Sequence, residues 1–229
     1  MRRIKLYPFL LAVILIAVIA LSGSLSTAKG QMTYGFTGIT NNNAGDTAIA
    51  ESQLSVDLFQ SNGFAVFQFN NAGPEASSIT DIYFDDNLGL LVSFGPIVPS
   101  AGVSYSTGAS PGNLPGGLGV TPQFVADFSL DSDPPAQPNG INPGEMLDVS
   151  FNFTGDLAGL ESAISSSELR IGIHVQGFAS GGSESLINNF NGNGNGNGNG
   201  NHIIPEPCSI LLSSVGIGVV GFLKRRRTI

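Results

Sequence analysis

The chain has 229 residues, enough for one domain with appended segments, since domains usually run to about 100–200 residues. Between Gly30 and Ile204 a single cation, Arg170, stands against sixteen carboxylates, a net charge of −15. Nucleic-acid binders need a basic surface, so this balance excludes DNA and RNA as partners. The single cysteine, Cys208, excludes an intrachain disulfide framework and a cysteine-based zinc site.

Residues 1–28 have the pattern of a secretory signal peptide. Three cations lie in the first five residues, and the apolar stretch Leu6–Leu21 follows them. The small residues Ser26-Thr27-Ala28 predict cleavage between Ala28 and Lys29. The alternative is an uncleaved anchor, but this stretch is short for a hydrocarbon core of about 30 Å.

Residues 29–188 predict an all-β domain, because apolar and polar residues alternate in many short segments. The clearest is Met146–Thr154, where Leu147, Val149 and Phe151 alternate with polar side chains. Eight strands favour a two-sheet β-sandwich of jelly-roll or immunoglobulin-like type. The predicted strands are 54–58, 64–70, 79–84, 88–94, 103–106, 124–130, 146–154 and 169–176, with 34–40 at an edge.

Three local signals refine this domain. Asn62-Gly63 between two apolar runs predicts a β-hairpin. The only helix that we expect in the domain is Asp156–Ser165, with Asp156 as its N-cap. His174 lies opposite the apolar side of its strand, which predicts an exposed or edge position.

Carboxylates are the only abundant chemical groups, so the one candidate cofactor is calcium. Asp85 and Asp86 lie at a strand end, and Asp131 and Asp133 flank a Pro-rich loop. Calcium takes six to eight oxygen ligands, which carboxylates and loop carbonyls supply. The alternative for these four residues is a solvated acidic surface without a metal.

We do not expect an enzyme. Gly108-Ala109-Ser110-Pro111-Gly112 matches the nucleophile motif G-x-S-x-G, and Asp127 or Asp131 and then His174 follow Ser110 in hydrolase order. The oxyanion hole of such an enzyme uses the N–H of the residue after the nucleophile, which Pro111 lacks. A secreted hydrolase is therefore the weaker alternative.

A carbohydrate-binding module is the other alternative. Sugar rings commonly stack on aromatic side chains, but the chain contains no Trp. Tyr83 and Tyr105 would have to take this role.

The C-terminal part of the chain begins with a linker over residues 189–204, in which Asn and Gly alternate from 191 to 201. Such a segment buries no apolar surface and is expected to be disordered. The tail 205–229 starts with Pro205-Glu206-Pro207 and continues with the apolar run Cys208–Leu223. This run predicts a membrane helix whose basic end stays cytoplasmic. The basic end consists of Lys224, Arg225, Arg226 and Arg227.

This tail resembles the PEP-CTERM sorting signal of Gram-negative bacteria, with Cys208 at a position where that family more often has Ser or Thr. The resemblance implies recognition by an exosortase, transient anchoring in the inner membrane and delivery to the cell surface or matrix. It also implies an association with exopolysaccharide and biofilm. We therefore expect an exported protein with a structural or adhesive role, which contacts extracellular polysaccharide. A plain C-terminal membrane anchor is the alternative for the tail.

Overall fold

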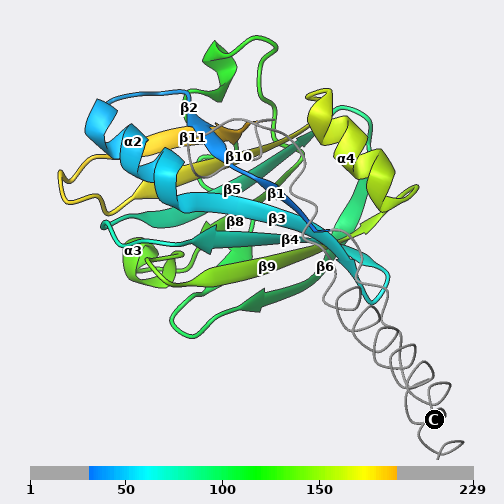
Figure 1. Cartoon of the computed structure of the whole chain (residues 1–229), viewed down its shortest axis with the longest axis horizontal. Coiled ribbons are helices and arrows are strands. Elements are labelled where there is room, and N and C mark those ends of the chain that lie inside the picture. The colour runs from blue at the N-terminus through cyan, green and yellow to red at the C-terminus, as the bar shows by residue number, and fades with distance from the viewer. Residues whose placement is uncertain (1–30, 190–229) are drawn as a thin grey trace, which may run out of the picture. The chain divides into compact units, whose positions relative to one another are not determined.

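A computed structural model of the protein describes residues 31–189 and shows a mostly β domain with two antiparallel sheets, as in a β-sandwich (Figure 1). This confirms the predicted all-β class. Sheet A has the order β1-β3-β4-β9-β6. Its strands are β1 (Met32–Tyr34), β3 (Leu54–Ser61), β4 (Phe64–Asn71), β9 (Met146–Phe153) and β6 (Leu91–Pro99).

Sheet B has the order β2-β11-β10-β5-β8-β7. The chain passes repeatedly between the sheets, because β5, β7 and β10 each follow a strand of sheet A. The strands of sheet B are β2 (Phe36–Gly38), β11 (Glu184–Asn188), β10 (Leu169–Gln176), β5 (Ser78–Asp86), β8 (Phe128–Ser132) and β7 (Tyr105–Thr107).

The core lies between the two sheets and contains a cluster of phenylalanine rings. Phe84 from sheet B meets Phe151 and Phe67 from sheet A at centroid distances of 4.9 and 5.1 Å, both edge to face. All three side chains are fully buried. Burying each such ring contributes about 1.5–3 kcal/mol to stability, so this cluster holds the sheets face to face.

The predicted hairpin is confirmed between β3 and β4. Asn62 and Gly63 both have positive φ angles, 50° and 88°, as a tight two-residue hairpin turn requires. The predicted edge segment 34–40 instead divides into β1 and β2, which join different sheets. Strand β11 was not expected, since its five residues show no clear alternation; it pairs with both β10 and β2.

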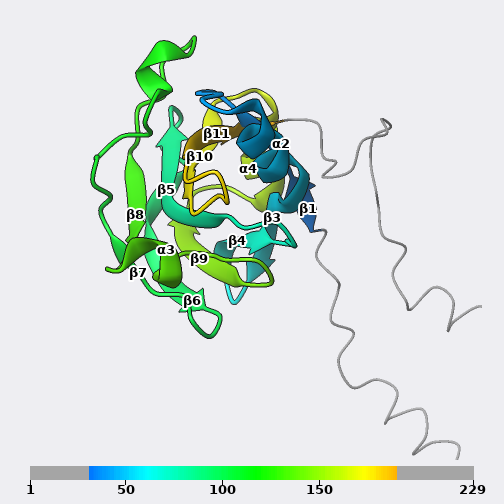
Figure 2. The same ribbon diagram turned by 90° about the vertical axis from the view of Figure 1, so that its left-hand side faces the viewer.

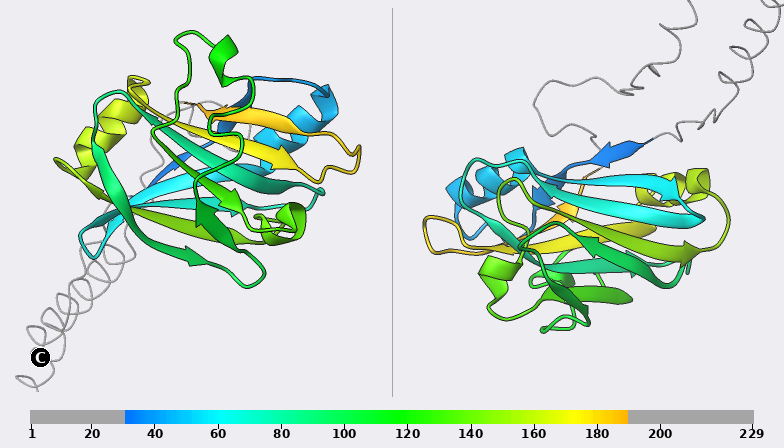
Figure 3. Two further views of the ribbon diagram at one scale, coloured as in Figure 1. Left: turned by 180° about the vertical axis from the view of Figure 1, so that it is seen from behind. Right: turned by 90° about the horizontal axis from the view of Figure 1, so that it is seen from below.

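The helices correct the prediction of a single helix. Helix α4 (Leu157–Ser165) is confirmed, and Asp156 caps it by accepting a 2.9 Å hydrogen bond from the Gly159 N–H. Helix α2 (Ala44–Gln53) was missed, because its apolar residues are few and only weakly segregated to one side. Figures 1 and 3 show α2 and α4 at opposite ends of the domain. Two shorter helices are α3 (Ala136–Asn139) and the 3₁₀ helix η1 (Gly117–Gly119).

A long segment, residues 108–127, connects β7 to β8 and contains η1. Its tip projects beyond the strands in Figures 1 and 2. Nearer the sheet, Leu114 and Phe124 of this segment form a second small core with Tyr83 of β5. We call residues 108–127 the covering loop, because they bury the outer side of sheet B around Tyr83.

Candidate functional site

Asp85, one of the predicted calcium ligands, is bound instead by the only cation of the described domain. Its carboxylate forms a buried ion pair with Arg170 and accepts a 3.1 Å hydrogen bond from the Val125 N–H. The Asp85 carboxylate therefore fastens the covering loop to β5.

Arg170 completes this attachment. Its guanidinium donates to the carbonyl of Pro122 at 2.7 Å and to that of Gln123, and it lies 5.3 Å from the centre of the Phe124 ring. Alternation along β10 correctly places Arg170 opposite the core. The sequence does not reveal that the covering loop buries it to 7% exposure.

Asp86, another predicted calcium ligand, is also held by hydrogen bonds to neighbouring segments. Its Oδ2 accepts a 2.6 Å hydrogen bond from the Leu91 N–H, across the turn into β6. Its own N–H donates to Asp127 Oδ2 at 2.8 Å. Both contacts fix the end of β5.

Asp131 and Asp133 lie elsewhere on sheet B. Asp131 is opposite Asp81 in the register of β5 and β8, while Asp133 accepts hydrogen bonds from the Ser104 and Ser106 hydroxyls. Across residues 31–189, no three His, Cys, Asp or Glu side chains gather as a metal site would require. The four predicted calcium ligands are thus not brought together.

The Asp81–Asp131 pair was not predicted as a unit. The two residues are direct cross-strand neighbours, and like charges in this position destabilise a sheet. Burial raises the pKa of Asp81 to about 6, the Thr80 hydroxyl opposes this rise, and Asp131 adds to it. Only the register of β5 and β8, which the sequence did not reveal, brings the two carboxyl groups together.

Two residues of the hydrolase alternative, His174 and Asp127, are held by other partners, while Ser110 is exposed on the covering loop. The Nδ1 atom of His174 lies 3.1 Å from the Ser185 hydroxyl, and Asp127 binds the Asp86 N–H. His174 is half-buried on β10, between β5 and β11, so the prediction of an exposed or edge position was wrong. Burial lowers its pKa, and Glu184 partly opposes this shift.

The two tyrosines of the carbohydrate-binding alternative do not form an open platform. Tyr83 is fully buried below the covering loop, and its hydroxyl donates to the Pro111 carbonyl at 3.0 Å. Burial raises its pKa well above the usual value. The Tyr105 hydroxyl donates to the Ile79 carbonyl. Tyr83 is therefore unavailable for stacking on a sugar.

The outer side of sheet A carries a row of polar groups. Asp57, Gln68 and Asp148 lie side by side on β3, β4 and β9. Gln68 Nε2 donates to Asp148 Oδ1 at 2.8 Å. The Asp57 carboxylate accepts from the Thr33 hydroxyl and, at 3.0 Å, from Asn70 Nδ2. Each carboxylate is held in place while keeping free acceptor capacity, because each oxygen has two lone pairs.

Apolar side chains lie beside this row on the same face of the sheet. Phe59 is two residues from Asp57 on β3, and Val66 and Phe64 are two and four residues from Gln68 on β4. Phe59 is paired with Val66, and neither belongs to the core between the sheets. The Phe64 ring lies across β9 onto β6, where a Cβ added to Gly95 would come within 2.7 Å of it. Together we call the two rows, Asp57-Gln68-Asp148 and Phe59-Val66-Phe64, the outer strip. The missed signal was β4 itself, whose residues 64–67 are apolar at both parities.

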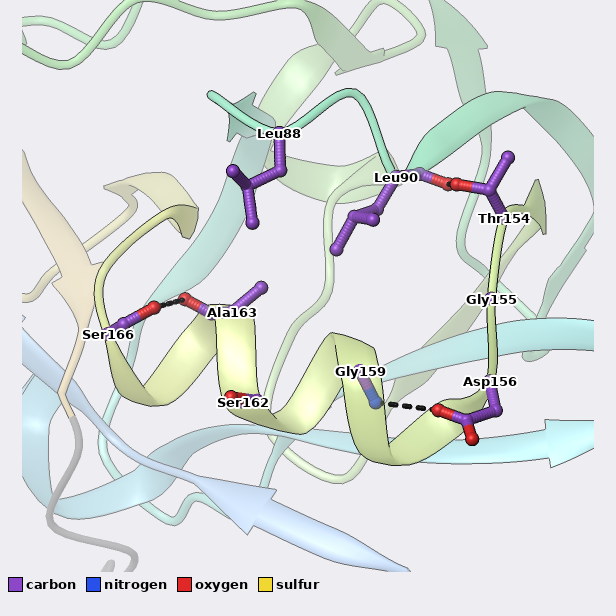
Figure 4. Close-up of a pocket in the computed structure, with 9 residues that line it drawn as sticks. All are labelled: Leu88, Leu90, Thr154, Gly155, Asp156, Gly159, Ser162, Ala163 and Ser166. Atoms are coloured by element: carbon purple, nitrogen blue, oxygen red, sulfur yellow. Dashed lines mark hydrogen bonds between the residues drawn. The ribbon is translucent and has the colours of Figure 1, made fainter.

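A shallow groove of roughly 620 Å³ lies between α4 and the turn from β5 to β6 (Figure 4). Leu88 and Leu90 face Ala163 across it, and Gly159 and Gly155 leave space on the other side. Asp156 lines the groove, but its carboxylate caps α4. The groove therefore offers space for an apolar group beside the hydroxyls of Thr154, Ser162 and Ser166.

The remaining predicted site residues fall outside residues 31–189. These are Ala28 and Lys29 at the expected cleavage point, and the tail residues Pro205, Glu206, Pro207, Lys224, Arg225, Arg226 and Arg227. Among the helices of residues 31–189, none is long and apolar enough to cross a membrane.

Comparisons of the chain with models of protein families, with curated proteins and with solved structures give no match.

Proposed function

We propose that this chain is an exported protein of the cell surface or extracellular matrix, with a structural or adhesive role. The observation that carries the proposal is the order of segments after the β domain. Pro205-Glu206-Pro207, the apolar run Cys208–Leu223 and the basic end Lys224–Arg227 follow one another at the C-terminus. An exosortase-type enzyme recognises the tail, which holds the protein in the inner membrane until processing.

The β domain supports this role through its charge and its surfaces. Residues 31–189 contain one cation, Arg170, and its charge is neutralised inside the domain by the buried Asp85 carboxylate. The surface is thus strongly acidic and repels other polyanions. Such a charge suits a domain that stays dispersed outside the cell.

A carbohydrate-binding module is the second candidate, and the outer strip favours it. Apolar side chains beside carboxylate and amide groups match the two kinds of surface that a sugar ring presents. Tyr83 and Tyr105 are not part of this version of the proposal.

For the fold, we propose the jelly-roll type over the immunoglobulin-like type, with the tail as a hydrophobic helix. The support is the connectivity. The connections from β4 to β5, β5 to β6, β8 to β9 and β9 to β10 all cross between the sheets. Immunoglobulin-like sandwiches place more consecutive strands in one sheet.

Intact mass tests the sorting. The full chain is expressed in an exosortase-bearing Gram-negative host, and the exported protein is recovered and weighed. We expect a chain that starts at Lys29 and lacks the segment after Pro205-Glu206-Pro207. Glu206→Gln combined with Ala at Arg225, Arg226 and Arg227 leaves export intact and blocks tail removal.

Cys208→Ser is the matched control, since it changes the same tail and restores a residue common in the resembled family. It should be processed like the parent chain. Unchanged processing of the Glu206 and arginine variant would refute the proposed recognition. A parent chain that retains residues 208–229 would identify a permanent membrane anchor.

A further inference from the structure

We propose that the outer strip of sheet A binds a polysaccharide that carries free amino groups. This inference rests on the proposed surface role and deepens it by naming the ligand class. The strip consists of the polar row Asp57-Gln68-Asp148 and the apolar row Phe59-Val66-Phe64.

The strip is partly accessible: Phe59, Phe64, Gln68 and Asp148 are half-buried, whereas Asp57 and Val66 are only 8% and 5% exposed. Helices α2, α3 and α4 make their main strand contacts with sheet B, at β2, β5, β8 and β10. These helices therefore leave the half-buried residues of the strip, Phe59, Phe64, Gln68 and Asp148, in contact with solvent. Figure 3 shows β3 and β4, in cyan, along one side of the domain. A flat surface without a deep pocket suits an extended polymer chain.

The chemistry of the two rows suits pyranose rings. A pyranose presents C–H groups on its faces and hydroxyl or amino groups around its edge. The C–H faces pack on Phe59 and on the Phe64 ring that spans β9 to β6. The edge groups donate to Asp148 and exchange hydrogen bonds with the Gln68 amide.

Charge complementarity selects an amino sugar over a neutral or acidic one. Asp57 and Asp148 lie two strands apart, about 9.5 Å, and the strip contains no cation. The only cation of residues 31–189 is buried against Asp85 on the other sheet. A protonated amine forms charge-assisted hydrogen bonds with the half-buried Asp148 carboxylate, the largely buried Asp57 adds to the negative potential, and a uronic acid is repelled.

Binding of soluble oligosaccharides to the full chain in mild detergent tests the proposal. The probes are an oligomer of glucosamine, the same oligomer fully N-acetylated, and polygalacturonate. We expect saturable binding of the glucosamine oligomer only, weakening as ionic strength rises from about 0.05 to 0.5 M.

Variants locate the site. Asp148→Asn keeps the acceptor for Gln68 and removes the charge, and should weaken binding about tenfold, as expected for loss of a charge-assisted hydrogen bond. Phe59→Ala should weaken it to a similar extent. Gln68→Ala, the third variant, removes the amide side chain without changing the charge of the strip. Thermal unfolding of each variant verifies that it is folded.

The controls match these changes away from the strip. Glu75→Gln removes one exposed charge from the loop after β4, and Val125→Ala trims an apolar side chain that is 55% exposed in the covering loop. Neither should alter binding. Absence of binding, or equal weakening by Glu75→Gln, would overturn the proposal.

Polylysine distinguishes a polysaccharide from a basic protein. Competition by polylysine that depends on Phe59 as strongly as glucosamine binding does would assign the strip to basic proteins and overturn the proposal. The intact-mass experiment is independent of these outcomes. A chain that is processed but does not bind the oligomer supports the sorting role and refutes binding at the outer strip. A chain that binds the oligomer but keeps its tail supports binding at the outer strip and refutes the sorting role.

Discussion

Asp81 carries the clearest electrostatic conflict among the described residues. Its carboxyl group is buried, lies opposite Asp131 and has a pKa raised to about 6. In the unfolded chain the group has its ordinary pKa near 3.8. Folding therefore favours the protonated form. The folded protein gains stability from this group as the pH falls from about 6 toward 3.8, and it loses that stability as the pH rises.

We therefore expect Asp81→Asn to stabilise the protein above pH 6, where the native carboxyl is charged. The expected gain is about 1–2 kcal/mol in the free energy of unfolding, after allowance for screening by solvent. The gain should shrink as the pH approaches 4. Urea unfolding between pH 4 and 8 measures it. Glu75→Gln, on an exposed loop, should leave the pH dependence unchanged, and a loss of stability in Asp81→Asn at pH 7 would contradict this account.

At the scale of elements, Arg170 is one of the main attachments of the covering loop. Arg170 pairs with Asp85, donates to two loop carbonyls and lies against Phe124. Removal of one partner from a buried ion pair commonly costs about 3–5 kcal/mol, because the other charge is left uncompensated. The same side chain thus sets both local order and overall stability.

Arg170→Met should release the covering loop. We expect a loss of about 3–5 kcal/mol in the free energy of unfolding and faster chymotrypsin cleavage near Leu118, which is 61% exposed. The double variant Arg170→Met with Asp85→Asn should recover part of the stability, since it removes the stranded charge. Mass spectrometry of the early fragments locates the cut. Val125→Ala, in the same loop, serves as control, and cleavage within residues 108–127 no faster than in the parent chain would refute the attachment.

The sequence predicted those elements whose signal is local. The alternation in β9 and β10 and the Asn62-Gly63 turn each lie within one short segment, and all three are confirmed. Helix α2 was missed because it has no strong apolar stripe. Its start depends on Asn43, whose side chain accepts from the Gly45 N–H, and on Glu184 from the far end of the domain.

The candidate sites were harder to predict, because their members come from distant strands. Asp81 meets Asp131, and Arg170 meets Asp85, only through the register of sheet B. The outer strip combines β3, β4 and β9 in the same way. No sequence spacing indicates these neighbours. The sorting residues of the tail, by contrast, are contiguous in the chain, and their role remains a prediction.

At the scale of the whole molecule, the net charge of residues 31–189 opposes folding. Sixteen carboxylates and one guanidinium give −15. Such self-repulsion destabilises a compact state and is screened by salt, with a Debye length of about 8 Å at 0.15 M.

Added salt should therefore raise the melting temperature. Between about 0.02 and 0.5 M NaCl we expect a rise of about 2–4 °C, which corresponds to roughly 1 kcal/mol for a protein of this size. Calorimetry of the full chain in a nonionic detergent measures it. Choline chloride at equal ionic strength should give the same rise if screening is the cause. A rise with sodium alone would indicate a bound ion instead.

The pairing of β2 with β11 has a consequence for the timing of folding. Phe36 near one end of the domain is the register partner of Asn188 near the other, and the Asn189 N–H donates to the Gly35 carbonyl at 3.0 Å. A chain that emerges from a ribosome or a secretion channel with its N-terminus first cannot complete sheet B until β11, the last described strand, has emerged. Contacts between residues so far apart in sequence also form slowly. Sheet B of this domain therefore closes only after β11 has arrived.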